Sequence, residues 1–279
     1  MRLPPVITIT SAIVLLLSGH LRAATEIPFE FRDGMVWVKV AASGKAGALN
    51  FLLDSGASAS VLDLQAARRL GVELGAAQSV QGVHSRCVAY KVDRFAGEMG
   101  GVAVPKRMLA LDLSAVSAGC HQRIDGLIGA DFFRGRIVQI DFAAEKVRLL
   151  SRGELNPAGC EALPIAARND AMCVRVAIDG EPAGWMRVDT GCNSALQWAP
   201  AADKMRRLSS ASIGLAPGSV RHLSTEVQLG SRRFEGVQTG IHWRQIFPCE
   251  AGLLGNGVLS KFTVTFDMQS RRLLLAGRY

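Results

Sequence analysis

The feature that most constrains this chain is a short motif that occurs twice. One apolar run ends in Asp54-Ser55-Gly56, and a second run ends in Asp189-Thr190-Gly191. A single tripeptide of this kind usually marks a turn. Each copy, however, is followed at a similar distance by two apolar residues and a glycine, Leu127-Ile128-Gly129 and Leu253-Leu254-Gly255. This recurrence favours two halves of one fold over two unrelated turns.

The similarity between the halves extends beyond these motifs. From the aspartate to the later glycine is 75 residues in the first half and 66 in the second. Each half then closes with a strand-like run that ends in Asp141 or Asp267, a turn and a final apolar run. Both of these aspartates precede turns, so we expect them to have a structural role. The pattern predicts an internal duplication of about 120 residues per copy.

The secondary structure expected for the chain is mostly strand. Short apolar runs separated by glycine and proline are typical of an all-β fold. The segment 77–92 predicts a hairpin with its tip at 81–85. Ser60 is the predicted N-cap of a short helix over 61–70. In the second half we expect a helix over 199–208.

The motifs resemble those of the aspartic protease superfamily. Asp-Ser-Gly-Ala-Ser at 54–58 and Leu-Ile-Gly-Ala-Asp-Phe-Phe at 127–133 are most similar to bacterial retropepsin-like proteases. In having two copies of the motif in one chain, however, the protein resembles the pepsin-like enzymes instead. The resemblance extends over nearly the whole chain after residue 23. It implies the all-β, two-lobed acid-protease barrel fold, with pseudo-two-fold duplicated lobes at 24–155 and 156–279.

The resemblance also implies a catalytic pair, Asp54 with Asp189. Two carboxyl groups in an apolar cleft share one proton, so one acts as base and the other as acid in hydrolysing a peptide bond with water. The implied partner is a peptide or protein substrate, with no cofactor and no metal. The residues implied to support the pair are Ser55, Gly56, Thr190 and Gly191.

A β-hairpin flap covers the substrate in this superfamily. Its tip residues here are expected to be Gly82, Val83 and His84. The third residue after each aspartate is Ala57 or Cys192, whereas pepsin-like enzymes carry a hydroxyl there in the first lobe. Because that hydroxyl stabilises the carboxylate anion, we predict a rate optimum less acid than pepsin's, above about pH 3. The second lobe also departs from the pattern at 253–257, Leu-Leu-Gly-Asn-Gly, where no aspartate follows the glycine.

Two alternatives to an active single-chain enzyme remain open. In the first alternative, the chain is a silent relative that binds peptide without cleaving it. In the second, it acts as a homodimer in which one lobe of each chain is active. The intact motif at 189–191 favours an active endopeptidase, and we expect a monomer. Cys192 with a distant histidine is formally a thiol-protease arrangement, but no local signature accompanies it.

The N-terminal residues predict export. Arg2 precedes an almost wholly apolar run at 6–17, and Leu21-Arg22-Ala23 is a suitable cleavage site. We therefore expect 1–23 to be a signal peptide and the protein to be periplasmic or secreted. The apolar run is short for a membrane span, so an uncleaved anchor is the weaker alternative. In such a compartment the six cysteines permit up to three disulfides.

Other classes of protein have little support in the sequence. The formal net charge is +8, but the arginines are scattered in pairs and form no stripe for nucleic acid. The chain has neither a Gly-x-Ser-x-Gly elbow nor a His-Glu-x-x-His motif. The histidines show no metal-ligand spacing.

Overall fold

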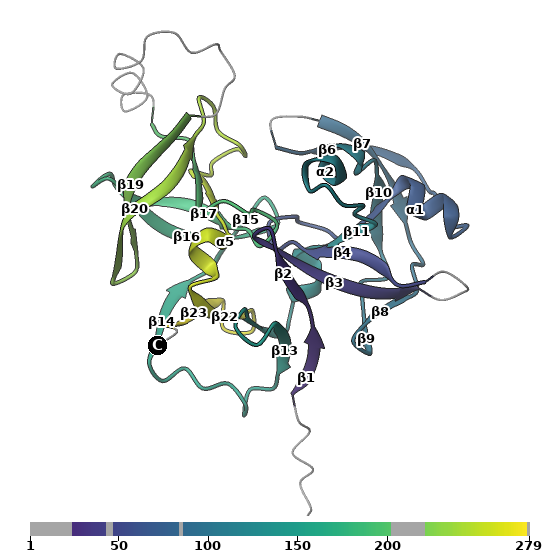
Figure 1. Ribbon diagram of the computed structural model, residues 1–279, viewed down its shortest axis with the longest axis horizontal. Coiled ribbons are helices and arrows are strands. Elements are labelled where there is room, and N and C mark those ends of the chain that lie inside the picture. Colours follow the sequence, from purple (N-terminus) through teal and green to yellow (C-terminus); the bar gives the residue numbers. More distant parts are fainter. Residues whose placement is uncertain (1–23, 43–46, 84–85, 202–220, 278–279) are drawn as a thin grey trace, which may run out of the picture.

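The computed structural model describes residues 24–42, 47–83, 86–201 and 221–277. The predicted signal peptide at 1–23, His84 and most of the predicted helix over 199–208 lie outside these ranges. Two β lobes lie side by side above a shared sheet, the first on the right in Figure 1 and the second on the left. The predicted all-β, two-lobed fold is confirmed.

The first lobe is one sheet with three short helices. Its strands are β2 (Glu30–Arg32), β3 (Met35–Ala42), β4 (Leu49–Leu53), β5 (Val61–Asp63), β6 (Ala77–Gln81), β7 (Arg86–Val92), β8 (Gly97–Met99), β9 (Val102–Ala103), β10 (Met108–Leu111) and β11 (Gly126–Ile128). Its helices are α1 (Leu64–Arg69), α2 (Ser114–Gly119) and α3 (Ala130–Phe133). The strand order is β6-β7-β10-β5-β11-β4-β3-β8-β9, with β2 paired to β3. The predicted hairpin is formed by β6 and β7.

The second lobe is a smaller sheet. Its strands are β15 (Ala166–Arg168), β16 (Ala171–Ile178), β17 (Gly184–Val188), β18 (Leu196–Trp198), β19 (Arg221–Leu229), β20 (Arg232–Ile241) and β21 (Gly252–Leu254), and its helix is α5 (Asn256–Leu259). The strand order is β15-β16-β17-β21-β18-β20-β19, and β19 also pairs with β16. This additional pairing closes the six strands from β16 to β19 into a barrel, and β15 remains as an edge strand beside β16.

The duplication is visible in the strand directions at the centre of each lobe. In the first lobe β4 runs parallel to β11, β11 antiparallel to β5, and β5 parallel to β10. In the second lobe β17 runs parallel to β21, β21 antiparallel to β18, and β18 parallel to β20. The two aspartate motifs follow β4 and β17, so they occupy equivalent places.

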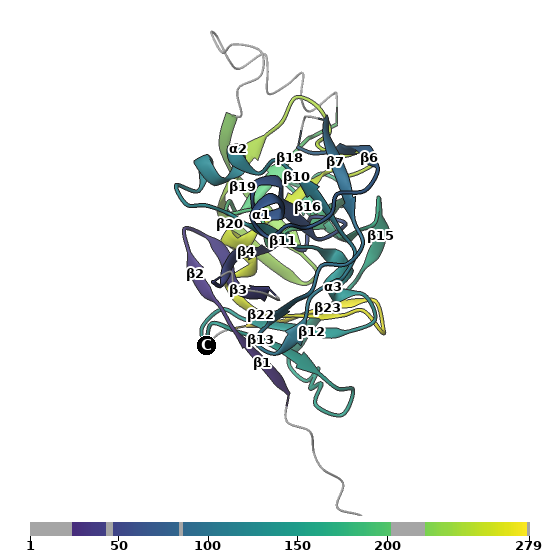
Figure 2. The same cartoon turned by 90° about the vertical axis from the view of Figure 1, so that its right-hand side faces the viewer.

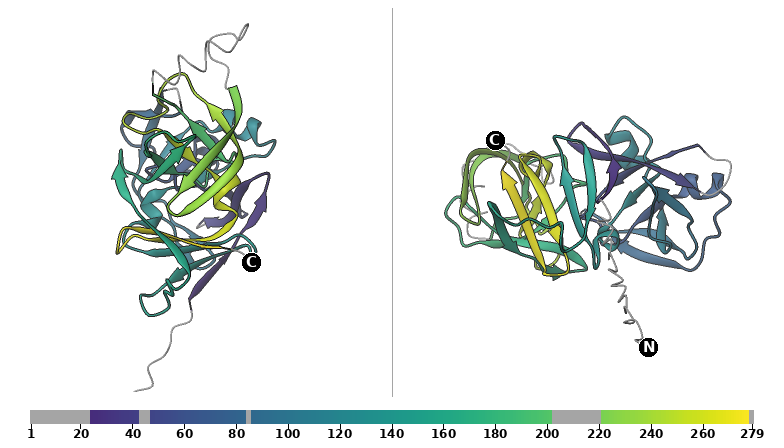
Figure 3. Two further views of the ribbon diagram at one scale, coloured as in Figure 1. Left: turned by 90° about the vertical axis from the view of Figure 1, so that its left-hand side faces the viewer. Right: turned by 90° about the horizontal axis from the view of Figure 1, so that it is seen from below.

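The shared sheet joins the two halves. Its strands are β1 (Thr25–Pro28), β13 (Lys146–Leu150), β12 (Ile137–Asp141), β22 (Phe262–Asp267), β23 (Arg272–Gly277) and β14 (Cys160–Pro164), in that spatial order. Figure 2 and Figure 3 show these strands gathered below the lobes. At its centre Ile137 pairs with Asp267 and Asp141 pairs with Thr263. This reciprocal register is the pattern of a two-fold axis, here within one chain.

The connection between the halves runs from the end of β13 to the start of β14, and the expected lobe boundary at 155/156 falls within it. One continuous apolar core extends from both lobes into the shared sheet. For example, Phe133 of α3 packs edge-on against Phe266 of β22, with ring centroids 4.8 Å apart. This packing ties the base of the first lobe to the closing hairpin of the second.

The expectation for Ser60 was wrong. The chain forms strand β5 over Val61–Asp63 before α1 begins at Leu64, and the N-cap is Asp63, whose carboxylate accepts from the backbone N–H groups of Gln65 and Ala66. Ser60 instead donates its hydroxyl to Asp131 at 2.7 Å. A tertiary carboxylate partner has therefore taken the hydroxyl that local preference assigned to a cap.

Within the described residues, no helix is long and apolar enough to cross a membrane. All six cysteines are free thiols in the structure. The three disulfides that the sequence permits are therefore not formed in this conformation.

Candidate active site

The two aspartates lie at the ends of equivalent strands, each fixed by the parallel strand beside it. The backbone N–H of Asp54 donates to the carbonyl of Ile128 at 2.9 Å. In the second lobe the N–H of Asp189 donates to the carbonyl of Leu254, also at 2.9 Å. The apolar-apolar-glycine segments noted in the sequence thus hold the aspartate loops, which explains why they recur together.

A network of hydroxyl groups joins the two loops across the lobe boundary. Ser55 donates its hydroxyl to the carbonyl of Val188 at 2.8 Å and accepts from the N–H of Thr190 at 3.1 Å. Thr190 donates its hydroxyl to the carbonyl of Leu53 at 2.7 Å and accepts from the N–H of Ser55 at 2.9 Å. Both side chains are buried. Each lobe therefore satisfies backbone groups of the other, and the loops are held as one unit.

The glycine of each motif lies against the aspartate of the other lobe. A methyl group added to Gly56 would lie 2.3 Å from Cγ of Asp189, and one added to Gly191 would lie 2.4 Å from Cγ of Asp54. No larger residue fits at either place without moving a carboxyl group. The missing side chains allow Asp54 and Asp189 to come together, near enough for the charge of Asp54 to raise the pKa of Asp189.

The two carboxyl groups have unequal surroundings. Asp54 Oδ1 accepts from the N–H groups of Gly56 at 3.0 Å and Ala57 at 2.9 Å, whereas Asp189 Oδ1 accepts from Gly191 at 2.9 Å. Desolvation raises the pKa of Asp54, although these N–H groups oppose the rise. Desolvation, and then the charge of Asp54, raise the pKa of Asp189 well above its usual range. We conclude that Asp189 keeps the shared proton and Asp54 carries the negative charge.

Solvent still reaches the pair. Both aspartates are only partly buried by surface exposure, even though protein atoms surround them densely enough to desolvate their charge. This arrangement suits a group that must contact water and substrate yet share one proton.

The second lobe has Gly257 where the first lobe has Asp131, and the packing around this position differs accordingly. In the first lobe Ser60 receives a hydrogen bond from the N–H of Gly129 at 2.9 Å and donates to Asp131. At the matching positions of the second lobe, Gly257 lies so close to Ala195 that a methyl group would be 2.7 Å from its Cα. A polar pair in one lobe is thus replaced by close packing of two small residues in the other.

Asn256, which the sequence analysis did not single out, adds a contact between the lobes. Its buried amide donates to the carbonyl of Thr190 at 2.8 Å and to that of Gly34, in the first lobe, at 2.7 Å. The sequence contained a signal: a polar residue directly after the second apolar-apolar-glycine segment, where the first half has Ala130. Buried amides are retained where they find partners, which here lie on both sides of the site.

The predicted flap residues are partly described. Gly82 and Val83 follow β6 at the end of the β6–β7 hairpin, and the side chain of Val83 is 53% exposed. In Figure 1 this hairpin lies at the top of the first lobe and points toward the second lobe. His84 lies outside the described residues.

The cysteine beside the second motif does not provide a nucleophile. Burial, and then the nearby Asp189, raise the pKa of the Cys192 thiol to about 12. The thiol group is therefore protonated at neutral pH, and a reactive cysteine requires the thiolate. Among the described residues, no three His, Cys, Asp or Glu side chains gather in an arrangement that would hold a metal ion.

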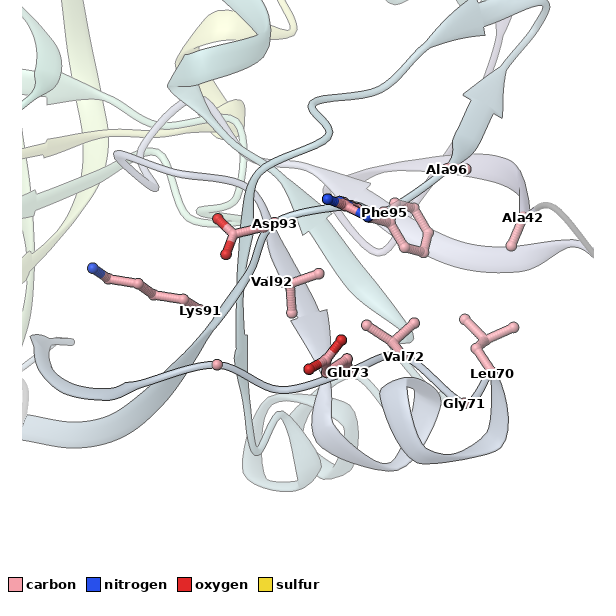
Figure 4. Close-up of a pocket in the computed structure, with 12 residues that line it drawn as sticks. Ala42, Leu70, Gly71, Val72, Glu73, Lys91, Val92, Asp93, Phe95 and Ala96 are labelled. Carbon is pink, nitrogen blue, oxygen red and sulfur yellow. The ribbon is translucent and has the colours of Figure 1, made fainter.

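A separate cavity of about 600 Å³ lies in the first lobe, away from the aspartate loops. It is bounded by the end of α1, where Leu70 and Val72 lie, and by the stretch after β7 that contains Asp93 and Phe95 (Figure 4). Neither motif contributes a residue to it, so it forms no part of the candidate active site.

The fold is a two-lobed one in which a single chain supplies two aspartate motifs, as in aspartic proteinases. Residues 38–132 match the family model Aspartyl protease. Among solved structures the chain is similar to an aspartic proteinase from Irpex lacteus, with a TM-score of 0.59 and 14% identity over 91% of this chain and 97% of that one. No curated protein matches the chain. The family model matches within the first lobe, and the structural match shows that the fold extends over both lobes.

Proposed function

We propose that this protein is an exported aspartic endopeptidase in which Asp54 and Asp189 activate a water molecule to hydrolyse peptide bonds. The observation that carries the proposal is the close approach of two carboxyl groups where the lobes meet, each against the glycine of the other loop and with different N–H partners. Two neighbouring carboxyl groups with separated pKa values supply one base and one acid at the same pH.

In the proposed reaction Asp54 is ionised and Asp189 is protonated when a peptide binds. Asp54 takes a proton from water as the water oxygen attacks the carbonyl carbon, while Asp189 gives its proton to the carbonyl oxygen. The product of this step is a neutral tetrahedral diol. Asp54 then protonates the nitrogen and Asp189 recovers a proton from a hydroxyl group as the C–N bond breaks. The pair returns to its starting protonation state, and the products are a carboxylic acid and an amine.

The substrate would bind as an extended strand between the aspartate loops and the β6–β7 hairpin. Extended peptides commonly bind proteins through main-chain hydrogen bonds to a strand, with pockets that select side chains. Val83 at the hairpin end provides an exposed apolar side chain for such contact. The proposed substrate class is therefore unfolded or flexible peptide segments.

The second candidate function is peptide binding without cleavage. It shares the fold and the aspartate loops but requires that the pair fail to activate water. The unequal environments of the two carboxyl groups favour the active enzyme, because a binding protein has no need for a shared proton.

The decisive experiment is cleavage of an unfolded protein mixture between pH 3 and 7, with the new termini identified by mass spectrometry. We expect the intact protein to cut, and Asp54→Asn and Asp189→Asn each to lose about 10²-fold or more. The control is Asp112→Asn, an exposed aspartate whose carboxylate accepts from the N–H of Ser114. Peptide binding without cleavage by the intact protein would support the second candidate.

The proposed location and assembly have their own tests. Export predicts that the mature protein isolated from the periplasm or medium begins at Ala24, which N-terminal sequencing would determine. A monomer is proposed because one chain supplies both aspartates. Sedimentation at the concentration of the cleavage assay would reveal a dimer if the active species requires two chains.

A further inference from the structure

A buried ion pair lies directly behind the second aspartate. Arg187, two residues before Asp189, donates from Nε to Glu250 Oε2 at 2.8 Å and from Nη2 to Glu250 Oε1 at 2.7 Å. The side chains are only 4% and 1% exposed. Two parallel hydrogen bonds of this kind fix the orientation of the guanidinium group.

The remaining nitrogen of the guanidinium group reaches into the other lobe. Nη1 of Arg187 donates to the carbonyl of Gly56 at 2.7 Å. Gly56 is the residue that lies against Asp189, so this bond holds the first-lobe loop at its closest approach to the second aspartate. The ring of Phe247 covers one face of the guanidinium group, 3.6 Å from its central carbon, and the amide of Asn169 donates to Glu250 at 2.9 Å.

The first lobe has no such pair. Leu52 and Ile124 stand at the matching positions, two before the aspartate and five before the glycine of the apolar-apolar-glycine segment, and both are buried in an apolar cluster. The duplicated fold therefore does not need charges there. Apolar residues of similar volume are usually at least as stabilising as a buried ion pair, so stability alone does not explain the pair.

We propose that Arg187 is a positioning residue that fixes the Gly56 loop of the first lobe to the second lobe and sets the acidity range in which the aspartate pair works, with Glu250 holding its guanidinium group in place. This inference rests on the proposed function and adds the residue that regulates the same site.

The charge of Arg187 acts on the pair in a defined direction. It lowers the pKa of both Asp54 and Asp189, against the larger effect of desolvation. Within the part of the chain that the structure describes, the other ionisable groups beside the pair or the arginine are the thiols of Cys192, next to Asp189, and Cys173, opposite Arg187 on β16. Arg168 of β15 lies beyond them. Burial raises the pKa of both thiols to about 12, so both are neutral in the acid range. Arg187 is thus the cation that acts on both aspartates.

Lysine would not replace Arg187. Its single ammonium group does not reproduce the planar fork that meets both oxygens of Glu250 while a third nitrogen reaches Gly56. The variant Arg187→Lys therefore separates the two parts of the proposal, since it keeps a positive charge but loses the fixed contact with the first lobe.

The experiment compares pH profiles of kcat/KM for the intact protein, the double variant Arg187→Met/Glu250→Gln and Arg187→Lys. The double variant avoids an unpaired buried carboxylate. Because both aspartate pKa values rise when the cation is lost, we expect both limbs of its profile to move to higher pH. Activity on the basic limb, relative to the optimum, should rise by about threefold or more. Arg187→Lys should lower kcat, while both limbs of its pH profile stay at the same pH as in the intact protein.

The matched control is Arg148→Met. Arg148 of β13 pairs with Glu26 and Asp141 in the shared sheet, so this variant removes one positive charge and two ion pairs without touching the aspartate loops. We expect its profile to coincide with that of the intact protein. A double variant whose limbs also coincide with those of the intact protein would overturn the proposed effect on acidity, and unchanged kcat in Arg187→Lys would overturn the positioning role.

Failure of the proposed function would be distinguishable. If the intact protein cleaves nothing, NMR titration of carbon-13-labelled aspartate carboxyl groups still decides the inference. Titration of Asp54 and Asp189 at higher pH in the double variant supports it, and unchanged titration overturns it. If the double variant does not fold, the spectrum of Arg187→Lys decides. A changed chemical shift of the Asp189 carboxyl carbon, with titration at the same pH, supports fixed positioning, and an unchanged spectrum contradicts it.

Discussion

The two lobes have the same strand pattern but differ in what lies behind their aspartates. In the first lobe Leu52 and Ile124 belong to a small buried apolar cluster. In the second lobe Arg187 and Glu250 form a buried ion pair at the matching positions. The backbone also differs, since the first aspartate accepts two N–H groups on one oxygen and the second accepts one.

This comparison separates geometry from acidity. The parts that are alike, the strand ends, hydroxyl groups and glycines, bring two carboxyl groups together. Among the parts that differ, the second N–H group at Asp54 stabilises its anion, whereas the charge of Arg187 lowers the pKa of both carboxyl groups. Two identical carboxyl groups that share one proton already form an acid and a base, so we expect the unequal surroundings to decide which aspartate keeps the proton.

The largest expected effect comes from breaking the ion pair of the second lobe. Glu250→Leu leaves the buried Arg187 without its carboxylate and should lower the free energy of unfolding by about 3–5 kcal/mol. Arg187→Leu/Glu250→Ile copies the residues of the first lobe and should be neutral within about 1 kcal/mol or stabilising. Urea unfolding followed by tryptophan fluorescence measures both. Equal destabilisation in the two variants would show that the lobes do not tolerate the same packing.

The next effect concerns the close approach of the loops, which is the same in both lobes. Gly56→Ala and Gly191→Ala each place a methyl group within 2.4 Å of the opposite Cγ, and so displace a carboxyl group. We expect kcat/KM to fall about 100-fold in each, because a displacement near 1 Å has that effect on aligned groups. Gly153→Ala, where a methyl group meets nothing within 4 Å, is the control. A variant with full activity would contradict the shared geometry.

The sequence predicted the core of the site because its motifs act locally. An aspartate, a hydroxyl residue and a glycine each have one role at the strand end, and the second copy shows that the turn is not accidental. Gly56 and Thr190, for example, each contact the loop of the opposite lobe directly. Residues whose function depends on adjacent backbone are the ones that such motifs capture.

What the sequence did not predict depends on partners distant in the chain. The shared sheet joins strands more than 100 residues apart, such as β12 and β22, and no local pattern specifies that pairing. Ser60 likewise hydrogen-bonds to Asp131, a partner distant in the sequence, instead of capping a helix. The sequence did contain one sign of the Arg187 ion pair, because an arginine occurs inside a strand-forming run where the other half has Leu52. A comparison of the motifs alone does not include that position.

A moderate effect is expected from the hydroxyl groups that cross the lobe boundary. Ser55→Ala and Thr190→Val each leave one buried N–H and one carbonyl of the opposite lobe without a partner. The free energy of unfolding should fall by about 2–3 kcal/mol in each, because unpaired buried backbone groups are costly. Similar decreases in the free energy of unfolding, measured with urea, would show that both hydroxyl groups stabilise the contact between the loops equally. A decrease in only one of the two variants would mean that one hydroxyl group alone stabilises the contact between the loops.

The smallest expected effect is a pH-dependent gain in stability. A carboxyl group whose pKa is raised by folding binds its proton more tightly in the folded state, so its contribution to stability declines as pH rises through that pKa. Asp189→Asn should therefore be more stable than the intact protein at pH 7, by about 1 kcal/mol or more, and Asp54→Asn by less. The gain should vanish below the pKa of an unfolded aspartate, about 3.9. Thermal unfolding between pH 3 and 7 measures it, and equal gains would contradict the inequality of the lobes.

The most direct test of the account is the titration of Asp189 by carbon-13 NMR in the intact protein and in Asp54→Asn. The account predicts that Asp189 titrates at higher pH than Asp54 in the intact protein. Replacing Asp54 should lower the pH at which Asp189 titrates, because the neighbouring negative charge is removed. Titration of Asp189 at the same pH in both proteins would contradict the claim that two lobes of one chain unite their aspartates in a single acid–base pair.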